Sequence, residues 1–288
     1  MIDLHCHTTN SDGTWTTEEL LKKAEETRIK ILSITDHDSV RAYYDINISD
    51  YYKGTLITGV EIHCVFNGAR IELLGYGFKK ENINKYLETL YGNGALINNR
   101  IKQFNDMVEI CKLNNVKISE KISYDPNTEY PEDIIYLDII KYSENRKLFT
   151  EEVWNSELLF VRKCTTDKEF ILYKDYTNDF PQAKDVSNII RNNGGKVFLA
   201  HLFTYELKDH IDFLKEMVKE NILDGVECYY SEFDYKQTKL IEDYCNSNNL
   251  FKSGGSDCHG DNEFKLGINL GTGYGDLIVK EEAIREWV

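Results

Sequence analysis

Two histidines separated by one residue, His5 and His7, constrain the fold and chemistry of this chain more than any other feature. They lie in the stretch 3–12, Asp-Leu-His-Cys-His-Thr-Thr-Asn-Ser-Asp, and the pattern predicts a strand over residues 2–7. Side chains alternate between the two faces of a strand, so both imidazoles would project from one face, about 6–7 Å apart. Such a pair suits a divalent first-row metal ion, although two histidines can also lie side by side on a surface strand.

Further residues of the metal-ligand type occur at the ends of other predicted strands. We expect these strands at residues 31–35, 55–60, 70–76, 196–200, 224–229 and 250–253, with amphipathic helices between most of them. In a parallel α/β barrel the carboxyl ends of the strands open on one face. The candidate ligands are His5, His7, Asp12, His37, Glu61, Glu72, His201, Asp257 and His259. A metal cluster explains this gathering better than a set of unrelated buried histidines does.

The segment 80–182 differs from the rest of the chain and is predicted to be a mostly helical insertion. A long helix is expected over residues 96–114, where apolar residues recur at helical spacing at Ile97, Ile101, Phe104, Val108 and Cys111. Two of the three prolines, Pro126 and Pro131, bracket the turn-rich stretch that follows. We therefore predict a barrel formed by residues 1–79 and 183–288, interrupted by this insertion.

The charge and the cysteines exclude several classes of protein. With 34 Lys+Arg and 49 Asp+Glu, the formal net charge is −15, and no basic stripe offers a surface for duplex DNA. The apolar runs, such as 31–34 and 197–200, are too short to cross a bilayer, and the first residues do not resemble a signal peptide. Seven scattered cysteines without a C-x-x-C pair indicate reduced thiols. We expect a cytoplasmic protein with no membrane partner.

Seven motifs, in order along the chain, resemble those of the PHP (polymerase and histidinol phosphatase) superfamily. They are Asp3-Leu-His5-Cys-His7-Thr, Ser11-Asp12-Gly13, Ile34-Thr35-Asp36-His37-Asp38, Gly59-Val60-Glu61, Leu74-Gly75-Tyr76, Gly194-Gly195-Lys-Val-Phe-Leu-Ala200-His201 and Ser256-Asp257-Cys-His259. Within the superfamily the chain most resembles the stand-alone phosphoesterases that act on nucleotides and on the 5′ ends of short RNA. The resemblance implies an α/β fold, a distorted (β/α)7 barrel.

The resemblance also implies two or three divalent metal ions, for which manganese, iron and zinc are all compatible with His and carboxylate ligands. It assigns His5, His7, Glu61 and Asp257 to one ion, Glu61 and His201 to a second, and Asp12, His37 and His259 to a third. A hydroxide that bridges the ions would attack phosphorus while the ions neutralise the phosphoryl oxygens. Asp257 is the candidate catalytic residue that orients this hydroxide and accepts its proton.

The sequence departs from the family pattern in two places. Glu72 stands where the family usually has a histidine, and it could bind the second ion in its place. His63, two residues after Glu61, could instead supply the missing imidazole, or it could be a surface or supporting residue. The Arg-Pro-His element of the insertion is absent from the corresponding stretch 134–139. Arg100 fits another basic position of the family and could clamp a substrate phosphate, or it could be a solvated helix residue.

The predicted function is a metal-dependent phosphoric-ester hydrolase. Its substrate would be a small phosphate ester or the terminal phosphate of a nucleotide or a short RNA end. A histidinol phosphatase is an alternative within the same superfamily. A barrel that binds metal for structure or regulation without catalysis is an alternative from another class. A proofreading module is disfavoured, because no polymerase sequence accompanies the motifs.

Overall fold

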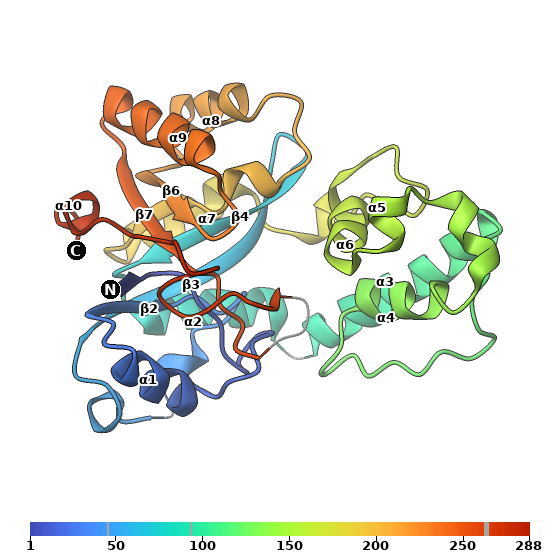
Figure 1. The fold of residues 1–288 in the computed structure, drawn as a ribbon, viewed down its shortest axis with the longest axis horizontal. Helices are drawn as coiled ribbons and strands as arrows, with labels where there is room; N and C mark the ends of the chain where they lie inside the picture. Colours follow the sequence, from blue (N-terminus) through green and yellow to red (C-terminus); the bar gives the residue numbers. More distant parts are fainter. Residues whose placement is uncertain (45, 93, 262–264) are drawn as a thin grey trace. The chain divides into compact units, whose positions relative to one another are not determined.

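The computed structural model describes residues 1–44, 46–92, 94–261 and 265–288. The chain forms two compact units, one made of residues 1–87 and 180–288 and the other of residues 88–179 (Figure 1). We call them the barrel unit and the helical unit. The predicted boundaries at 79/80 and 182/183 lie close to these, and their meaning as functional domains stays a prediction.

The barrel unit is built on a sheet of seven strands that are hydrogen-bonded in sequence order. The strands are β1 (Ile2–Asp3), β2 (Ile31–Ile34), β3 (Thr55–Phe66), β4 (Ala69–Tyr76), β5 (Lys196–Leu199), β6 (Gly225–Tyr230) and β7 (Phe251–Gly255). Neighbouring strands are parallel except that β4 runs antiparallel to both β3 and β5. This nearly closed sheet confirms the predicted α/β barrel of the PHP type.

The first and last strands approach each other and bring the two ends of the sheet together. The Leu4 amide donates to the Gly254 carbonyl at 3.1 Å, and the His7 amide donates to the Cys258 carbonyl at 2.9 Å. A Cβ atom on Gly255 would lie 2.2 Å from the His5 amide nitrogen, so this position requires glycine. The buried Asp3 carboxylate accepts hydrogen bonds from the Ser256 amide at 2.9 Å and from the Gly271 amide at 2.7 Å.

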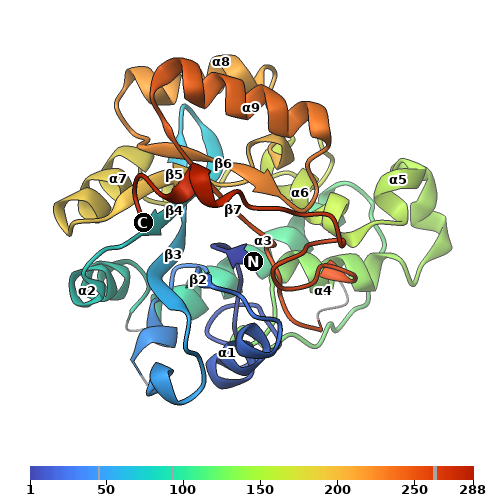
Figure 2. The same ribbon diagram turned by 60° about the vertical axis from the view of Figure 1, so that its left-hand side comes forward.

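Helices lie around the outside of the strands in the barrel unit (Figure 2). They are α1 (Thr17–Glu26), α7 (Ala183–Asn192), α8 (His210–Lys219), α9 (Tyr235–Asn248) and α10 (Glu281–Ile284), with the 3₁₀ turns Arg41–Tyr43, Ile48–Asp50 and Leu202–Thr204. The helix α2 (Lys80–Tyr91) begins in this unit. A capping box begins α1, because the Thr16 side chain accepts from the Glu19 amide and the Glu19 side chain accepts from the Thr16 amide. The buried face of α1 carries Leu20, Leu21 and Ala24.

β3 is longer than the strand predicted over residues 55–60, and Glu61 therefore lies inside the strand and not at its end. Glu72 likewise lies inside β4. β3 continues through Glu61 to Phe66, where Asn67 and Gly68 connect it to β4. Both turn residues have positive φ, 50° and 75°, as a two-residue β-hairpin requires. The candidate ligands of these two strands therefore lie within a hairpin, where His63 pairs directly with Glu72.

The helical unit has a hydrophobic core of its own. Its elements are α3 (Ala95–Leu113), α4 (Pro131–Ile139), α5 (Glu151–Trp154), α6 (Glu157–Thr166) and the 3₁₀ turns Ser143–Leu148 and Thr177–Asp179. The core contains Met107, Cys111, Ile135, Phe160 and Leu172, among others. Ile101 was expected on the apolar face of α3 but is 41% exposed, because the buried face follows Met107 and Cys111. No helix in the described part of the chain is long and apolar enough to cross a membrane.

Candidate metal centre

The structure brings all nine predicted ligands into overlapping groups within the barrel unit. Each group consists of His, Asp or Glu atoms that lie within 4.8 Å of one another. The groups are His5, His7, Glu61 and Asp257; Glu61, Glu72 and His201; His7, Asp12, His37 and His259; and His37, His63 and Glu72. These residues come from strands and loops between positions 5 and 259, which explains why no short motif contains them all.

The first group is the most deeply buried, and Glu61 lies at its centre. The Glu61 Oε2 atom is 3.1 Å from His5 Nε2 and 3.3 Å from His7 Nε2. Asp257 Oδ1 is 3.1 Å from His7 Nε2 and 3.4 Å from His5 Nε2. The other oxygen of Glu61, Oε1, is 2.9 Å from His201 Nε2, so this carboxylate faces two groups at once. A carboxylate in this position can bridge two cations.

Asp12 and Glu72 contribute carboxylate oxygens to two other groups, Asp12 to the group with His37 and His259 and Glu72 to the group with His201. Asp12 Oδ2 lies 3.3 Å from His259 Nε2 and 3.7 Å from His37 Nε2. Glu72 Oε2 lies 3.3 Å from His201 Nε2. The position of Glu72 therefore matches a donor to the second group, as the sequence led us to expect.

Three of the histidines are oriented by a hydrogen bond on the ring nitrogen that faces away from the cluster. His5 Nδ1 contacts Glu227 Oε1 at 2.8 Å, His201 Nδ1 contacts the Thr204 hydroxyl at 3.0 Å, and His259 Nδ1 contacts the Asp257 carbonyl at 2.8 Å. When Nδ1 donates in this way, Nε2 presents its lone pair to the cluster. The same arrangement supports histidine ligands in metalloproteins.

Lys265 and Tyr230 hold Asp257 and were not identified from the sequence. The Lys265 Nζ atom lies 2.6 Å from Asp257 Oδ2, and the Tyr230 hydroxyl donates to the same oxygen at 2.9 Å. One carboxylate oxygen thus faces His5 and His7 while the other is fixed by two donors. Neither residue belongs to a ligand motif. Tyr230 directly follows the strand predicted over residues 224–229, and its position there was the only sequence feature that pointed to the site.

Two buried nitrogen atoms show that the side chains alone do not satisfy the cluster. His7 Nε2 and His37 Nδ1 are buried and have no well-aligned hydrogen-bond partner among the described residues. Both nonetheless lie within 3.3 Å of a carboxylate oxygen. Buried polar atoms are rarely left without a partner, whereas lone pairs directed at a cation need no aligned donor. The donor set therefore fits divalent cations.

The electrostatics of the cluster agree with this interpretation. Burial lowers the pKa of His7, but the carboxylates of Asp257 and Glu61 outweigh it and raise that pKa to about 10. Burial raises the pKa of Asp257, but Lys265 and the neighbouring histidines hold it well below its ordinary value. Negative charge therefore favours protonation of the His7 imidazole, whereas burial lowers the pKa of His37. A divalent cation would take the place of the proton on His7, because metal binding requires neutral imidazole.

Three residues of the site have a left-handed backbone conformation. Asp38, His201 and Asp257 have φ values of 49°, 22° and 57°. This conformation costs about 1–2 kcal/mol for a residue other than glycine, and it persists where surrounding contacts enforce it. At His201 the enforcing contact is visible, because its amide donates to Glu227 Oε2 at 2.8 Å.

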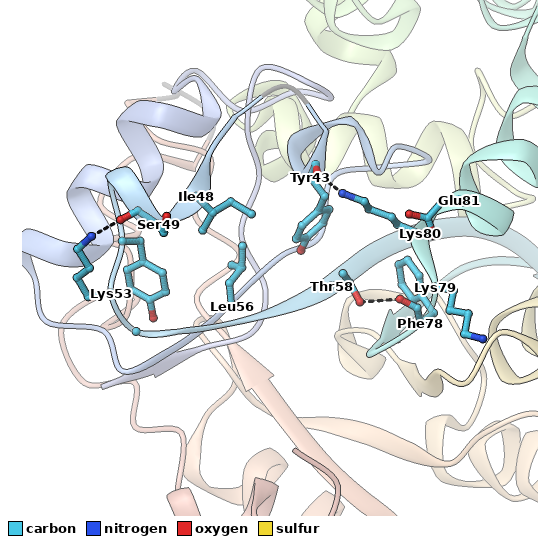
Figure 3. A pocket seen from close by; sticks show the side chains of 12 residues that line it. Tyr43, Ile48, Ser49, Lys53, Leu56, Thr58, Phe78, Lys79, Lys80 and Glu81 are labelled. Atoms are coloured by element: carbon cyan, nitrogen blue, oxygen red, sulfur yellow. Dashed lines mark hydrogen bonds between the residues drawn. The ribbon is translucent and has the colours of Figure 1, made fainter.

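A groove of about 660 Å³ in the barrel unit is separate from the cluster. It is lined by residues around the start of β3, including Tyr43, Leu56, Thr58 and Phe78 (Figure 3). The Lys80 amino group points into this region but donates to the Tyr43 carbonyl. The groove thus lies toward the amino end of β3, whereas Glu61 and His63 follow farther along the strand.

Arg100, the predicted substrate-binding residue, lies on α3 in the helical unit. Its Nη1 atom donates to the Pro126 carbonyl at 3.1 Å, and its guanidinium stacks 4.4 Å from the centre of the Tyr130 ring. Its Nε atom is buried without a hydrogen-bond partner among the described residues. These contacts hold the guanidinium in place, and its role toward a substrate stays a prediction.

Comparison of the sequence with models of protein families shows which family the chain belongs to. Residues 3–154 match the family model described as the PHP domain, which is more than half of the chain. The chain belongs to the PHP domain family. The resemblance found in the sequence motifs is thereby confirmed, and so is the predicted enzyme class, a hydrolase of phosphate esters.

Individual PHP proteins resemble the chain in sequence and in fold. A protein of Haemophilus influenzae named 5′-3′ exoribonuclease is 28% identical over 207 residues, which cover 71% of this chain and 70% of that protein. The 5′-3′ exoribonuclease Rnm of Escherichia coli is 42% identical over 78 residues, 26% of this chain and 27% of that protein. A Bifidobacterium adolescentis structure named as a metal-dependent phosphoesterase has a TM-score of 0.68 and 21% identity, covering 99% of this chain and 94% of that one.

Proposed function

We propose that this PHP protein is a metal-dependent phosphoesterase that hydrolyses phosphate esters at the 5′ end of short RNA or of nucleotides. The observation that carries the proposal is the buried cluster in which Glu61 faces His5 and His7 with one oxygen and His201 with the other. The names of the two exoribonuclease relatives support the substrate class. We further propose that the protein works in the cytoplasm.

The ligand groups would hold two or three divalent ions. His5, His7, Glu61 and Asp257 would hold one, Glu61, Glu72 and His201 a second, and Asp12, His37 and His259 a third. Manganese, iron and zinc all suit these mixed nitrogen and oxygen donors. Bound divalent ions supply a water of lowered pKa and neutralise charge on the phosphoryl oxygens.

Asp257 is the proposed catalytic residue of the chain. Lys265 and Tyr230 fix its Oδ2 atom, which leaves Oδ1 directed toward His5 and His7. From this position Oδ1 could accept a hydrogen bond from the attacking water and then its proton. Arg100 is the proposed partner of a substrate phosphate, because a guanidinium binds phosphate through two parallel hydrogen bonds.

The proposal is tested by measuring metal content and hydrolysis on one preparation, with wild type beside His7→Ala. The substrates are an aryl phosphate, mononucleotides, nucleoside 3′,5′-bisphosphates, histidinol phosphate and a short 5′-phosphorylated RNA, each offered with manganese. We expect two or three ions per chain in wild type, preferred hydrolysis of RNA or nucleotides, and loss of both metal and activity in the variant.

Other outcomes would contradict parts of the proposal. Preferred hydrolysis of histidinol phosphate would show that RNA ends and nucleotides are the wrong substrate class. Metal without turnover on any substrate, unchanged by Asp257→Asn, would indicate a binding or regulatory barrel. Absence of metal from wild type would reject the metal centre itself. Circular dichroism of each variant shows whether the fold is retained.

A further inference from the structure

The two oxygens of Glu72 face different sets of donors. Glu72 Oε2 is 3.3 Å from His201 Nε2, in the second ligand group. Glu72 Oε1 is 3.0 Å from His63 Nε2, on the opposite side. The second contact follows from the β3–β4 hairpin, in which His63 and Glu72 are direct cross-strand partners on the same face of the sheet.

Asp38 fixes His63 through both its backbone and its side chain. The His63 amide donates to Asp38 Oδ1 at 3.2 Å, and His63 Nδ1 contacts Asp38 Oδ2 at 2.8 Å. A carboxylate can only accept a hydrogen bond, so the proton of this contact lies on Nδ1. Nε2 is then directed at Glu72. Metal-ligating histidines almost always have such a partner on their other ring nitrogen.

His37 contributes a third atom to the same position. Its Nδ1 atom is buried, has no well-aligned hydrogen-bond partner among the described residues, and lies 3.2 Å from Glu61 Oε2 and 4.0 Å from Glu72 Oε1. The His37 and His63 rings are 4.8 Å apart between centroids. The ligand atoms of His37, His63 and Glu72 all lie within 4.8 Å of one another. An imidazole lone pair and a carboxylate oxygen facing each other at 3.0 Å repel, so either a proton or a metal ion lies between His63 Nε2 and Glu72 Oε1.

We propose that His63 and Glu72 bind a further divalent transition-metal ion beside His37, with Glu72 Oε1 facing this position and Glu72 Oε2 facing the second ligand group. The inference rests on the proposed function only in taking the cluster to be a metal centre. The mixed imidazole and carboxylate donors suit manganese, iron or zinc rather than calcium. His63 is thereby a metal ligand of the chain, and Asp38 is its positioning residue.

The test compares His63→Gln with His210→Gln in protein loaded with zinc and freed of excess ions. His210 is the matched control, because it is the one histidine outside the ligand groups and glutamine keeps a donor at each position. Metal analysis should show one ion per chain fewer in the His63→Gln variant than in the control. The ions of the other groups should remain.

A second measurement determines which ring nitrogens of His63 carry a proton. Long-range ¹H–¹⁵N spectra of the zinc-loaded protein should show His63 with a proton on Nδ1 and none on Nε2. Protons on both nitrogens, together with unchanged zinc content in His63→Gln, would overturn the inference and leave a proton between His63 and Glu72. In that case wild-type metal content and hydrolysis would be unaffected, whereas failure of the proposed function would show as their absence in wild type.

Discussion

A single buried carboxylate, Glu227, orders two of the candidate ligands. Its Oε1 atom accepts from His5 Nδ1, and its Oε2 atom accepts from the His201 amide, each at 2.8 Å. The first contact fixes the orientation of an imidazole, and the second holds His201 in its left-handed conformation. Through these two contacts Glu227 supports the candidate ligands.

Glu227→Gln should weaken metal binding about 10- to 100-fold, as is typical for groups that orient metal ligands. A glutamine has one acceptor oxygen and cannot serve both donors, because its amide nitrogen would face an N–H group. Competition with a chromophoric chelator measures the affinity. Glu242→Gln is the control, because Glu242 lies on α9, accepts from the Tyr229 hydroxyl and belongs to none of the ligand groups. Equal affinities in the two variants would contradict the prediction.

Sequence reasoning selected the nine candidate ligands because imidazole and carboxylate side chains recur beside predicted strands, and the structure brings these nine together. It could not identify Lys265, which contacts Asp257 through the conformation of a loop. A lysine eight residues after an aspartate has no periodicity and no motif. Its contact with Asp257 is a tertiary one, which a single sequence does not encode in a readable pattern.

Among the elements, the β3–β4 hairpin has the most influence on the site. Its two-residue turn, Asn67-Gly68, fixes the register that pairs His63 with Glu72. The Asn-Gly pair is a strong hairpin signal. The sequence-based interpretation ended the strand at residue 60 because polar Glu61 and His63 interrupt the apolar run. In the structure these polar residues belong to the groups of candidate ligands, so the usual link between polarity and strand ends does not hold here.

Gly68→Ala should lower the free energy of unfolding by about 1–2 kcal/mol, because alanine resists the left-handed conformation that this residue adopts. Urea denaturation measures the change. Asn67→Gly is the matched control at the same turn and should cost less, since glycine accepts positive φ. The prediction is wrong if the two variants unfold at the same urea concentration.

The stability of the helical unit should depend on pH through Glu157, the first residue of α6. Burial raises the pKa of Glu157 to about 7 from an ordinary value of 4.5, and its Oε1 atom has no hydrogen-bond partner among the described residues. The folded state therefore holds this proton more tightly than the unfolded state does. Stability is highest below the unfolded pKa and falls as pH rises through the interval to about 7.

Glu157→Gln should remove this dependence. Because the carboxyl group is partly exposed, we discount the shift for solvent screening and expect the variant to be about 1 kcal/mol more stable than wild type at pH 8. At pH 4 the two proteins should be about equally stable. Urea denaturation at both pH values measures the difference, with the exposed Glu109→Gln on α3 as control. A gain of the same size at both pH values would point to packing instead of ionisation.

At the scale of the whole molecule, the chain has two separate cores. The helical unit packs Met107, Ile135 and Phe160 together, and these residues lie entirely within 88–179. All the ligand groups belong to the barrel unit. The change from alternating strands and helices to helices alone was readable from the sequence. The exposure of Ile101 was not, because helical spacing alone does not determine which of two adjacent faces is buried.

Ile135→Ala should destabilise the helical unit by about 2–5 kcal/mol, because it leaves a cavity in a fully buried position. Hydrogen exchange should speed up in residues 88–179, while the metal content of the barrel unit stays at the wild-type value. Leu137→Ala on the same helix is the control, since Leu137 is 41% exposed. Loss of metal from Ile135→Ala would show that the two cores are energetically coupled.

The closure of the sheet between its first and last strands has a consequence for biosynthesis. A ribosome delivers His5 and His7 first, but the carboxylate of Asp257 and the imidazole of His259 follow some 250 residues later. At translation rates of roughly 5–20 residues per second, more than ten seconds separate the synthesis of these histidines from that of Asp257 and His259. Until then neither the first nor the third ligand group is complete. A nascent or prematurely terminated chain therefore lacks donors of both groups, and we expect it to bind metal more weakly than the complete chain does.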